Sequence, residues 1–570
     1  MPESDGARQV IARMVQAVLW IAVCGYAAFV ILSLFGTPVG EFDDAIPLVG
    51  GMLVKQGLTP GPDFYTVYPP LGLYVDAFLF GLFGRTVVAT RAFDAALYVA
   101  LLFLASRFFR RRLPHASPLV PLATLLFVTG IGSAVTAPSW PGFVISLAGL
   151  FVYLSPRDPQ KNPLFAVAAS GTLTGISFLY RANFAGYVAA AVVIGLLLRR
   201  NFKEIGAFAL PILVCSAVFY PVVYGTDALV IVPRIFAAAA GAIAVHFITL
   251  EFSHRLVFAL MFPPLWFCFR IWRDGNARSV KLLVAAGIAI ALPVVALAGG
   301  TYTSIPYLLV SAEVASVILF HLFARRLDQF ELALLLFYCC NLHYYLSRAD
   351  LGHFAFIPIA LAMLLPFAWF NPWPNPTFRR WAALVLPGIA FLLIVETAVT
   401  QPEISKARIG AHILAGARHN AGKSDTELVV DSAPAPAWAA LYPDENELQA
   451  IRYLRDRTSS SDPIFVGYRD HSRIFLNDLR FYWLANRPVA VRTFELESGH
   501  ATEAAVQREI IEDLQRRHVS WLVLDMSLQY FGDPGFEPAA DAGSELLDAY
   551  IGQNFQPVAR FGRYGIFASR

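Results

Sequence analysis

The stretch that decides the fold is Glu41-Phe42-Asp43-Asp44, which comes shortly after a long apolar run and opens a loop reaching Tyr68-Pro69-Pro70. A carboxylate inside hydrocarbon costs several kcal/mol, so an acidic pair beside an apolar run marks the point where the chain leaves a membrane. Loops held by a rigid scaffold carry function more often than the elements that they connect. We therefore expect a functional site on this loop, at a membrane surface.

The composition is that of a polytopic membrane protein. Hydrophobic residues make up 57% of the chain and charged residues 15%, and the mean hydropathy is +0.56. Soluble domains have about 25% charged residues, and their apolar runs are too short to cross a bilayer. The net charge of +3 gives no indication of a nucleic-acid partner. The cysteines all lie in apolar segments, so neither a disulfide framework nor a thiolate metal site is predicted.

About thirteen membrane-spanning helices are predicted. The first covers about residues 15–34 and has no small-residue cleavage site after it, which favours a retained helix over a signal peptide. The others are expected at about residues 87–108, 119–137, 142–155, 163–179, 185–198, 206–224, 255–272, 282–299, 307–324, 330–346, 354–370 and 381–399.

The basic residues predict the orientation. Clusters such as Arg107 to Arg112, Arg199-Arg200 with Lys203, and Arg270 to Lys281 fall on the same side as the N-terminus. Basic loops face the cytoplasm, so the N-terminus is predicted to be inside and the loops on the other face to carry the chemistry.

Leu71–Phe83 is apolar but too short to span. An α-helix of that length covers about 20 Å, less than the roughly 30 Å hydrocarbon core. Asp76 also lies inside it. We expect a helix along the membrane surface, within one ordered outer loop covering residues 35–86.

Two domains are predicted: a transmembrane domain over residues 1–400 and a soluble α/β domain over 401–570. The second region holds more than half of the 41 acidic residues. Its pattern predicts strands and amphipathic helices in alternation. The strands are expected at 427–431, 463–468 and 521–525, the helices at 445–457 and 502–517, and a helix followed by a strand over 544–568. With an odd number of spans, this domain is extracytoplasmic.

Together, the acidic pair, the Tyr-Pro-Pro leading into a surface helix, and the topology resemble the GT-C superfamily of membrane glycosyltransferases. The pattern is similar to that of the bacterial aminoarabinose transferases and the protein O-mannosyltransferases, most clearly over residues 1–200. The resemblance implies an inverting enzyme of cell-envelope glycan biosynthesis in the bacterial cytoplasmic (inner) membrane. It also implies a polyprenyl-phosphate sugar as donor and a lipid, glycan or protein hydroxyl as acceptor, with no organic cofactor and with the metal question open.

By position in the motif, Asp43 corresponds to the catalytic carboxylate of that family and Asp44 to its neighbour. A carboxylate at the interface can take the proton of the acceptor hydroxyl. The alternative is that either Asp caps the helix that begins at Ala45. Glu41 is interpreted as a solvated residue.

Binding of the donor phosphate is assigned first to Arg181, in Tyr180-Arg181-Ala182-Asn183 between two apolar segments. Arg and phosphate form a strong charge-assisted pair. Tyr68 and Asn183 are placed with Arg181 as substrate-binding residues. The alternative for Arg181 is a side chain that only anchors a helix end.

Arg348, Asp350 and His353 form a third polar cluster, on one outer turn. It is predicted to bind phosphate or sugar, with an ion pair between Arg348 and Asp350 as the alternative. A His and an Asp alone make a poor metal site. Arg91 and Asp94, one turn apart, are interpreted as a structural pair. An acceptor path past His246, Glu251, His254 and Arg255 is a further hypothesis.

Two other classes of protein stay open. A transporter would also have many spans, but no internal repeat is found in this sequence. A non-catalytic polysaccharide assembly protein would keep the topology without requiring Asp43.

Overall fold

The computed structural model describes most of the N-terminal and C-terminal parts of the chain. The described residues are 3–112, 139–155, 163–225, 228–229, 333–334, 336–337, 341, 401–431, 438, 440–442, 444–474, 476–497, 499–527 and 543–570. The predicted spans at 119–137 and those between 255 and 399 lie outside these ranges, apart from the few positions at 333–341.

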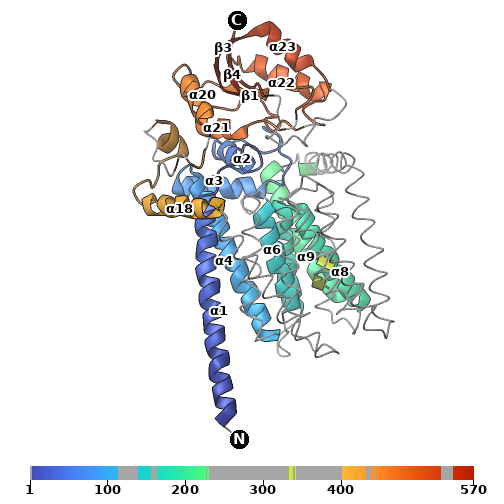
Figure 1. Ribbon diagram of the computed structural model, residues 1–570. Helices are drawn as coiled ribbons and strands as arrows, with labels where there is room; N and C mark the ends of the chain where they lie inside the picture. Colours follow the sequence, from blue (N-terminus) through green and yellow to red (C-terminus); the bar gives the residue numbers. More distant parts are fainter. Residues whose placement is uncertain are drawn as a thin grey trace, which may run out of the picture.

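Long apolar helices form a bundle below the C-terminal part (Figure 1). Within the described residues, three helical segments are long and apolar enough to cross a membrane: Gln16–Phe35, Val87–Arg110 and Phe202–Tyr224. The bundle consists of α1 (Glu3–Phe35), α4 (Val87–Arg112), α6 (Ser139–Leu154), α7 (Pro163–Tyr180), α8 (Ala182–Leu198) and α9 (Phe202–Tyr224). Each of these helices falls at a position where the hydropathy pattern predicts a span. The chain is a multi-pass membrane protein, and the total of about thirteen spans stays a prediction.

Short helices lie across the upper ends of this bundle. They are α2 (Ala45–Lys55), α3 (Leu71–Phe83) and, beside α1, α18 (Gln401–Gly416) (Figure 1). Helix α3 is the predicted surface helix, and it begins and ends at the predicted residues. It packs closely on α2 because Gly51 has no side chain: a Cβ there would lie 2.8 Å from the Cβ of Asp76.

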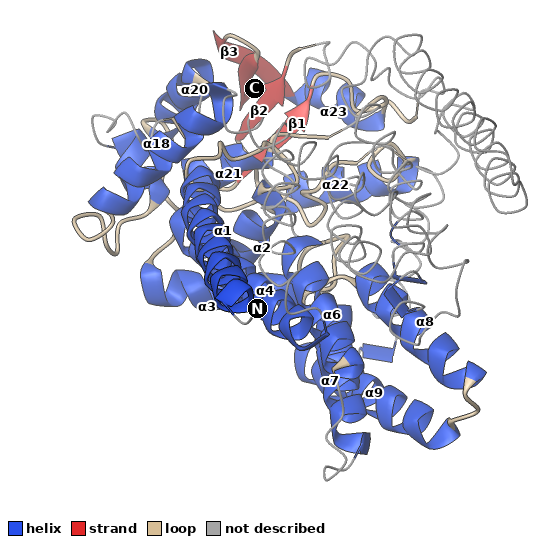
Figure 2. Ribbon diagram, turned by 60° about the horizontal axis from the view of Figure 1, so that its bottom comes forward, coloured by secondary structure: helices blue, strands red, loops and turns tan. Residues whose placement is uncertain are grey.

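The C-terminal part contains a four-stranded sheet with the order β1-β2-β4-β3. Its strands are β1 (Ile464–Tyr468), β2 (Trp521–Asp525), β3 (Phe555–Phe561) and β4 (Tyr564–Ser569), and its helices are α20 (Glu445–Arg455), α21 (Leu479–Ala485), α22 (Ala504–Arg516) and α23 (Leu546–Asn554). Strands β1 and β2 are parallel, and the other pairs are antiparallel. Figure 2 shows the strands gathered at one side of the molecule, with α20 and α23 on either side of them.

Two predictions of secondary structure are wrong. The strand expected at 427–431 is a π-helix, η3 (Thr426–Asp431). A short apolar run alone does not distinguish a strand from a buried helical turn. Here Arg452 favours the wide turn, because its guanidinium donates to the carbonyls of Val429 and Val430. The single strand expected near the C-terminus is a hairpin, β3 and β4, which turns at Gly562 with φ at +54°.

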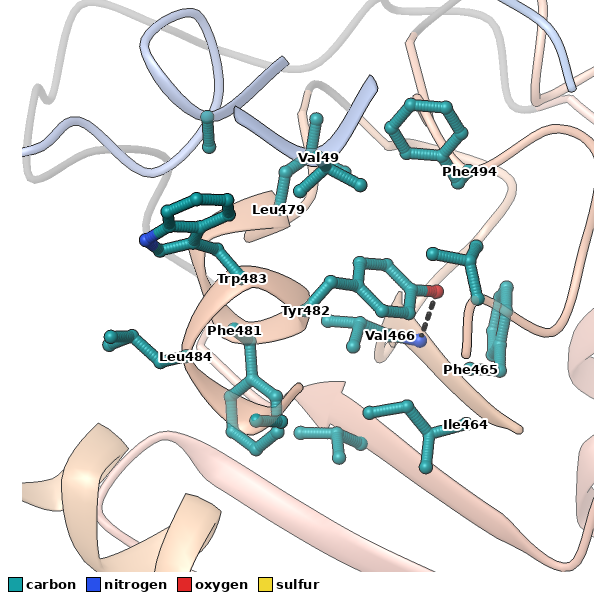
Figure 3. Close-up of a cluster of buried hydrophobic side chains, with 14 of the residues drawn as sticks. Val49, Ile464, Phe465, Val466, Leu479, Phe481, Tyr482, Trp483, Leu484 and Phe494 are labelled. Atoms are coloured by element: carbon teal, nitrogen blue, oxygen red, sulfur yellow. Dashed lines mark hydrogen bonds between the residues drawn. The ribbon is translucent and has the colours of Figure 1, made fainter. Parts of the chain in front are cut away.

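The core of the C-terminal part continues into the outer loop. Buried side chains of α2 and α3 belong to the same hydrophobic cluster as those of α21 and the sheet. Figure 3 shows Val49, from α2, beside Leu479 of α21. Phe80 of α3 packs against Trp483, with ring centroids 5.1 Å apart. The outer loop and the C-terminal part are thus packed as one body.

Candidate active site

A cleft of about 60 Å³ opens where α2, α3 and α4 meet the beginning of α6 and the end of α7. Its apolar walls include Ile46, Pro69 and Pro141. Its polar lining consists of Asp44, Tyr68, Thr90, Asp76, Arg91, Asp94 and Tyr180. Carboxylates and hydroxyls around a small cleft can hold a polyhydroxylated group, such as a sugar, by hydrogen bonds.

Only one residue of the acidic pair, Asp44, lines this cleft. Asp43 is exposed, and its Oδ1 accepts a hydrogen bond at the long limit of 3.5 Å from the hydroxyl of Tyr68. Asp44 lines the cleft, and its Oδ2 accepts from the backbone N–H of Gly40 at 3.0 Å. Asp44 stands at the N-cap of α2, but its side chain makes no capping bond to that helix. The alternative that Asp44 serves as a side-chain cap is therefore wrong.

Glu41 differs from the sequence interpretation. Its carboxylate is not simply solvated, because it forms ion pairs with Arg563 and, at 3.7 Å, with Arg480. Both arginines come from the C-terminal part, more than 400 residues away in sequence. A local sequence pattern carries no signal for such a partner.

Arg181 lies against Tyr68. Its guanidinium carbon is 4.3 Å from the centre of the Tyr68 ring, a favourable cation–π arrangement. Arg181 is half-buried and has an extended backbone between α7 and α8. Asp43, Tyr68 and Arg181 therefore form a continuous chain of contacts, and Tyr68 connects it to the cleft that it lines. The sequence predicts a functional role for each of them and cannot show that they touch.

Asn183 lies in the first turn of α8, next to Arg181, and is half-buried. Its side-chain oxygen is buried and accepts no hydrogen bond among the described residues. A buried amide oxygen without a donor is costly, so a ligand donor there would be favourable. Its predicted role in binding stays a prediction.

The buried polar residues of the inner wall were not predicted as part of the site. Arg91 donates from Nη1 to the carbonyls of Leu34 and Phe35 at 3.1 Å, and so binds the C-terminal end of α1. The described residues show no ion pair between Arg91 and Asp94, both of which line the cleft. Burial raises the pKa of the Asp76 carboxyl well above its ordinary value. The sequence feature that could have identified this wall is Asp76 itself, because a carboxylate within an apolar helix indicates a functional site.

The third predicted cluster, Arg348, Asp350 and His353, lies outside the described residues, as do His246, Glu251, His254 and Arg255. Among the residues that the structure does describe, no group of three or more His, Cys, Asp or Glu side chains is placed to hold a metal ion.

Comparison of folds gives full-length matches. No family model matches the sequence, and no curated protein matches it. Two crystal structures of ArnT from Cupriavidus metallidurans superpose over nearly the whole chain. The apo form has a TM-score of 0.51 at 14% identity and covers 98% of each chain. The form bound to undecaprenyl phosphate has a TM-score of 0.50 at 14% identity and covers 97% of this chain and 98% of that one. The chain has the fold of ArnT.

The predicted resemblance is therefore confirmed at the level of the fold. The Archaeoglobus fulgidus oligosaccharyltransferase has a lower TM-score of 0.48 at 12% identity, over 95% of this chain and 73% of that one. The likeness to ArnT includes the membrane bundle and the C-terminal part. It supports the polytopic class and leaves the roles of single residues as predictions.

Proposed function

We propose that this protein is a membrane glycosyltransferase. It moves a sugar from a polyprenyl-phosphate donor to an acceptor hydroxyl at the outer face of the bacterial cytoplasmic membrane. The observation that carries the proposal is the contact chain from Asp43 through Tyr68 to Arg181, in which Tyr68 also lines a cleft with carboxylates in its wall. The same fold in ArnT has been crystallised with undecaprenyl phosphate, which supports a donor of that class.

The proposed reaction breaks the bond between the anomeric carbon and the phosphate oxygen. The acceptor oxygen forms the new bond from the opposite face of the sugar, which inverts the anomeric configuration. Asp43 takes the proton of the acceptor hydroxyl, and its exposed position lets an acceptor reach it from water. The leaving polyprenyl phosphate carries the negative charge, and Arg181 stabilises that charge.

Asp44 has a different role in this proposal. Asp44 lines the cleft, and its carboxylate accepts a hydrogen bond from the N–H of Gly40. We assign it to orienting the sugar, together with the polar groups of the inner wall. The acceptor, whether lipid, glycan or protein, approaches from the side of Asp43.

The decisive experiment compares Asp43→Asn with wild type in cells that lack the chromosomal gene. Loss of the gene should cause one polyprenyl-phosphate sugar to accumulate, as seen by mass spectrometry of extracted lipids, and wild type should clear it. Asp43→Asn keeps the size of the side chain but removes the base, so transfer should fall at least about 100-fold.

The matched control is Asp63→Asn, which changes another exposed carboxylate on the same outer loop and should clear the lipid normally. All variants are checked for membrane insertion and for a single peak in size-exclusion chromatography. Full clearance by Asp43→Asn would contradict the base assignment. No accumulation without the gene would favour a non-catalytic assembly protein or a transporter.

A further inference from the structure

We infer that the C-terminal part of the chain positions the acidic loop, and that Arg563 and Arg480 are positioning residues for Asp43 and Asp44. The activity readout of this inference rests on the proposed function, whereas its structural readout does not.

Backbone bonds attach the segment just before the acidic pair to the C-terminal part. The N–H groups of Leu479 and Arg480, at the start of α21, both donate to the carbonyl of Glu41, at 2.8 and 3.2 Å. On the other side, the N–H of Val39 donates to the carbonyl of Leu441 at 3.0 Å. Arg480 also donates from Nη1 to the carbonyl of Val39 at 2.7 Å. Residues 39–41 are therefore held at more than one point.

Side-chain charges reinforce this attachment. The Glu41 carboxylate pairs with Arg563, whose guanidinium also reaches Asp525 at 3.2 Å and Asp478 at 3.4 Å. Arg563 comes from the turn between β3 and β4, so it connects the sheet directly to the outer loop. The charge of Arg563 compensates these three carboxylates, because without it their negative charges would repel one another in a partly buried site.

Arg480 is the second cation and is almost completely buried. It forms an ion pair with Glu447, which is fully buried in α20, and lies near the Glu41 carboxylate. The network therefore includes both α20 and α21 as well as the hairpin.

The acidic pair itself stands between two fixed points. On one side are residues 39–41, and on the other is α2, whose first residues Ala45 and Ile46 are fully buried. Phe42, between the two, is also buried, and its carbonyl accepts from the N–H groups of Ala45 and Ile46. With both ends held, Asp43 and Asp44 have little freedom to move.

The hydrogen-bond partner of Asp43 is held by the same part of the chain. The N–H of Tyr65 donates to the carbonyl of Arg492 at 2.9 Å. Two residues further, the N–H of Val67 donates to Glu495 at 3.2 Å, just before Tyr68. Both sides of the contact between Asp43 and Tyr68 thus take their position from described residues of the C-terminal part, which gives this part a role in catalysis that the fold alone does not assign.

The test uses full-length protein in detergent and compares Arg563→Ala, Arg563→Lys and a control. The control is Arg560→Ala, in the same hairpin, whose exposed guanidinium donates only to the carbonyl of Gly562 among the described residues. Hydrogen exchange followed by mass spectrometry measures the protection of residues 39–45 and, for comparison, of β1 and β2.

We expect Arg563→Ala to speed exchange in residues 39–45 at least about tenfold while β1 and β2 keep their protection. Binding of undecaprenyl phosphate should stay within about twofold of wild type, because Arg181 is untouched. Transfer, measured as clearance of the accumulated lipid, should fall at least about tenfold, since a displacement of about 1 Å is costly to catalysis. Arg563→Lys should recover part of both losses because it keeps the charge.

Two results would overturn the inference. One is a folded Arg563→Ala protein with unchanged exchange in residues 39–45, and the other is equal loss of protection in the loop and the strands, which indicates a purely structural role. If Arg563→Ala does not fold, Glu41→Gln removes the charge from the loop side and is judged by the same criteria. Should wild type transfer no sugar, the proposed function fails while the exchange result stands by itself.

Discussion

Arg181 has a position that its neighbours specify closely. Its N–H donates to the carbonyl of Ser177 at 2.8 Å, and the hydroxyl of Ser177 donates to the carbonyl of Gly142 at 2.7 Å. A Cβ at Gly142 would lie 2.7 Å from the Cβ of Arg181, so only glycine fits at this crossing. Packing at the beginning of α6 thus directs the guanidinium toward Tyr68.

Replacement of Arg181 by Ala should weaken binding of undecaprenyl phosphate about tenfold or more, because it removes the half-buried cation that is proposed to bind the phosphate. Arg181→Lys should be milder, since it keeps the charge but loses the paired donors. Fluorescence titration of purified protein measures both. The control is Arg457→Ala, which removes another arginine that stacks on a tyrosine. The guanidinium carbon of Arg457, just after the end of α20, is 3.6 Å from the centre of the Tyr453 ring.

Unchanged binding in Arg181→Ala would show that the residue only anchors a helix end. The phosphate site would then have to be sought among His246, His254 and Arg255.

At this scale the sequence identifies the residues that lie beside breaks in apolar runs. Asp43, Tyr68 and Arg181 belong to this group, and they meet in the structure. It does not identify Arg91 and Asp94 as cleft residues, because side chains inside a predicted span carry no mark of the direction in which they point. The role of Glu41 depends on partners that no local pattern contains.

At the scale of the elements, the outer loop docks on Arg492 and Glu495, and we expect this docking to depend on the protonation of Glu495. Glu495 is fully buried, and its Oε1 has no hydrogen-bond partner among the described residues. Burial raises the pKa of Glu495 well above its ordinary value of 4.5, and the charges of Glu497 and Asp43 raise it further, against hydrogen bonds from Val67 and Thr66. Tyr65 stacks on His500 in the same interface, at 4.4 Å between ring centroids, and burial lowers the pKa of that histidine.

The sign of the Glu495 effect follows from linkage. A carboxyl whose pKa is raised by folding stabilises the docked loop fully below about 4.5, and this contribution is lost as the pH rises toward the folded pKa. Glu495→Gln stays neutral and can still accept from the N–H of Val67. The variant should therefore have a higher Tm than wild type at pH 7.5, with a smaller difference at pH 5. Thermal unfolding in detergent across this range measures it, and equal Tm curves would contradict the assignment.

Elements with a strong periodic pattern could be predicted closely. The surface helix α3 and the strands β1 and β2 appear at or within one residue of their predicted bounds. The π-helix η3 could not, because its turn is stabilised by Arg452 of another helix. The sequence predicts one strand in place of the hairpin of β3 and β4, because the turn around Gly562 is too short to interrupt the strand pattern.

At the scale of the whole molecule, the basic C-terminal end of α4 lies on the side of the membrane bundle away from the sheet. Arg91, near the beginning of α4, contacts the end of α1, and the two helices lie side by side (Figure 1), so they run in opposite directions. The C-terminal end of α4, whose sequence includes Arg107 and Arg110, therefore lies toward the N-terminal end of α1 and away from the C-terminal sheet (Figure 1). This distribution supports an internal N-terminus and an external sheet.

Labelling of single cysteines in a cysteine-free protein tests this topology. A cysteine at Ser459, exposed in the C-terminal part, should react with a membrane-impermeant maleimide in intact cells. A cysteine at Lys203, exposed at the beginning of α9, should react only after the membrane is opened. Reaction of both from the same side would contradict the predicted number of spans and the placement of the acidic loop.

The ion pair between Glu41 and Arg563 also has a consequence for biosynthesis. The two residues are separated by 522 positions, so the ribosome makes Arg563 long after Glu41. Contacts between distant positions form late, because a long loop must close first. The acidic loop would therefore lack this ion pair until the hairpin of β3 and β4 has been made. A nascent or truncated chain without this hairpin would hold Asp43 and Asp44, the proposed catalytic residues, but would lack the ion pair from Arg563 that helps to position them.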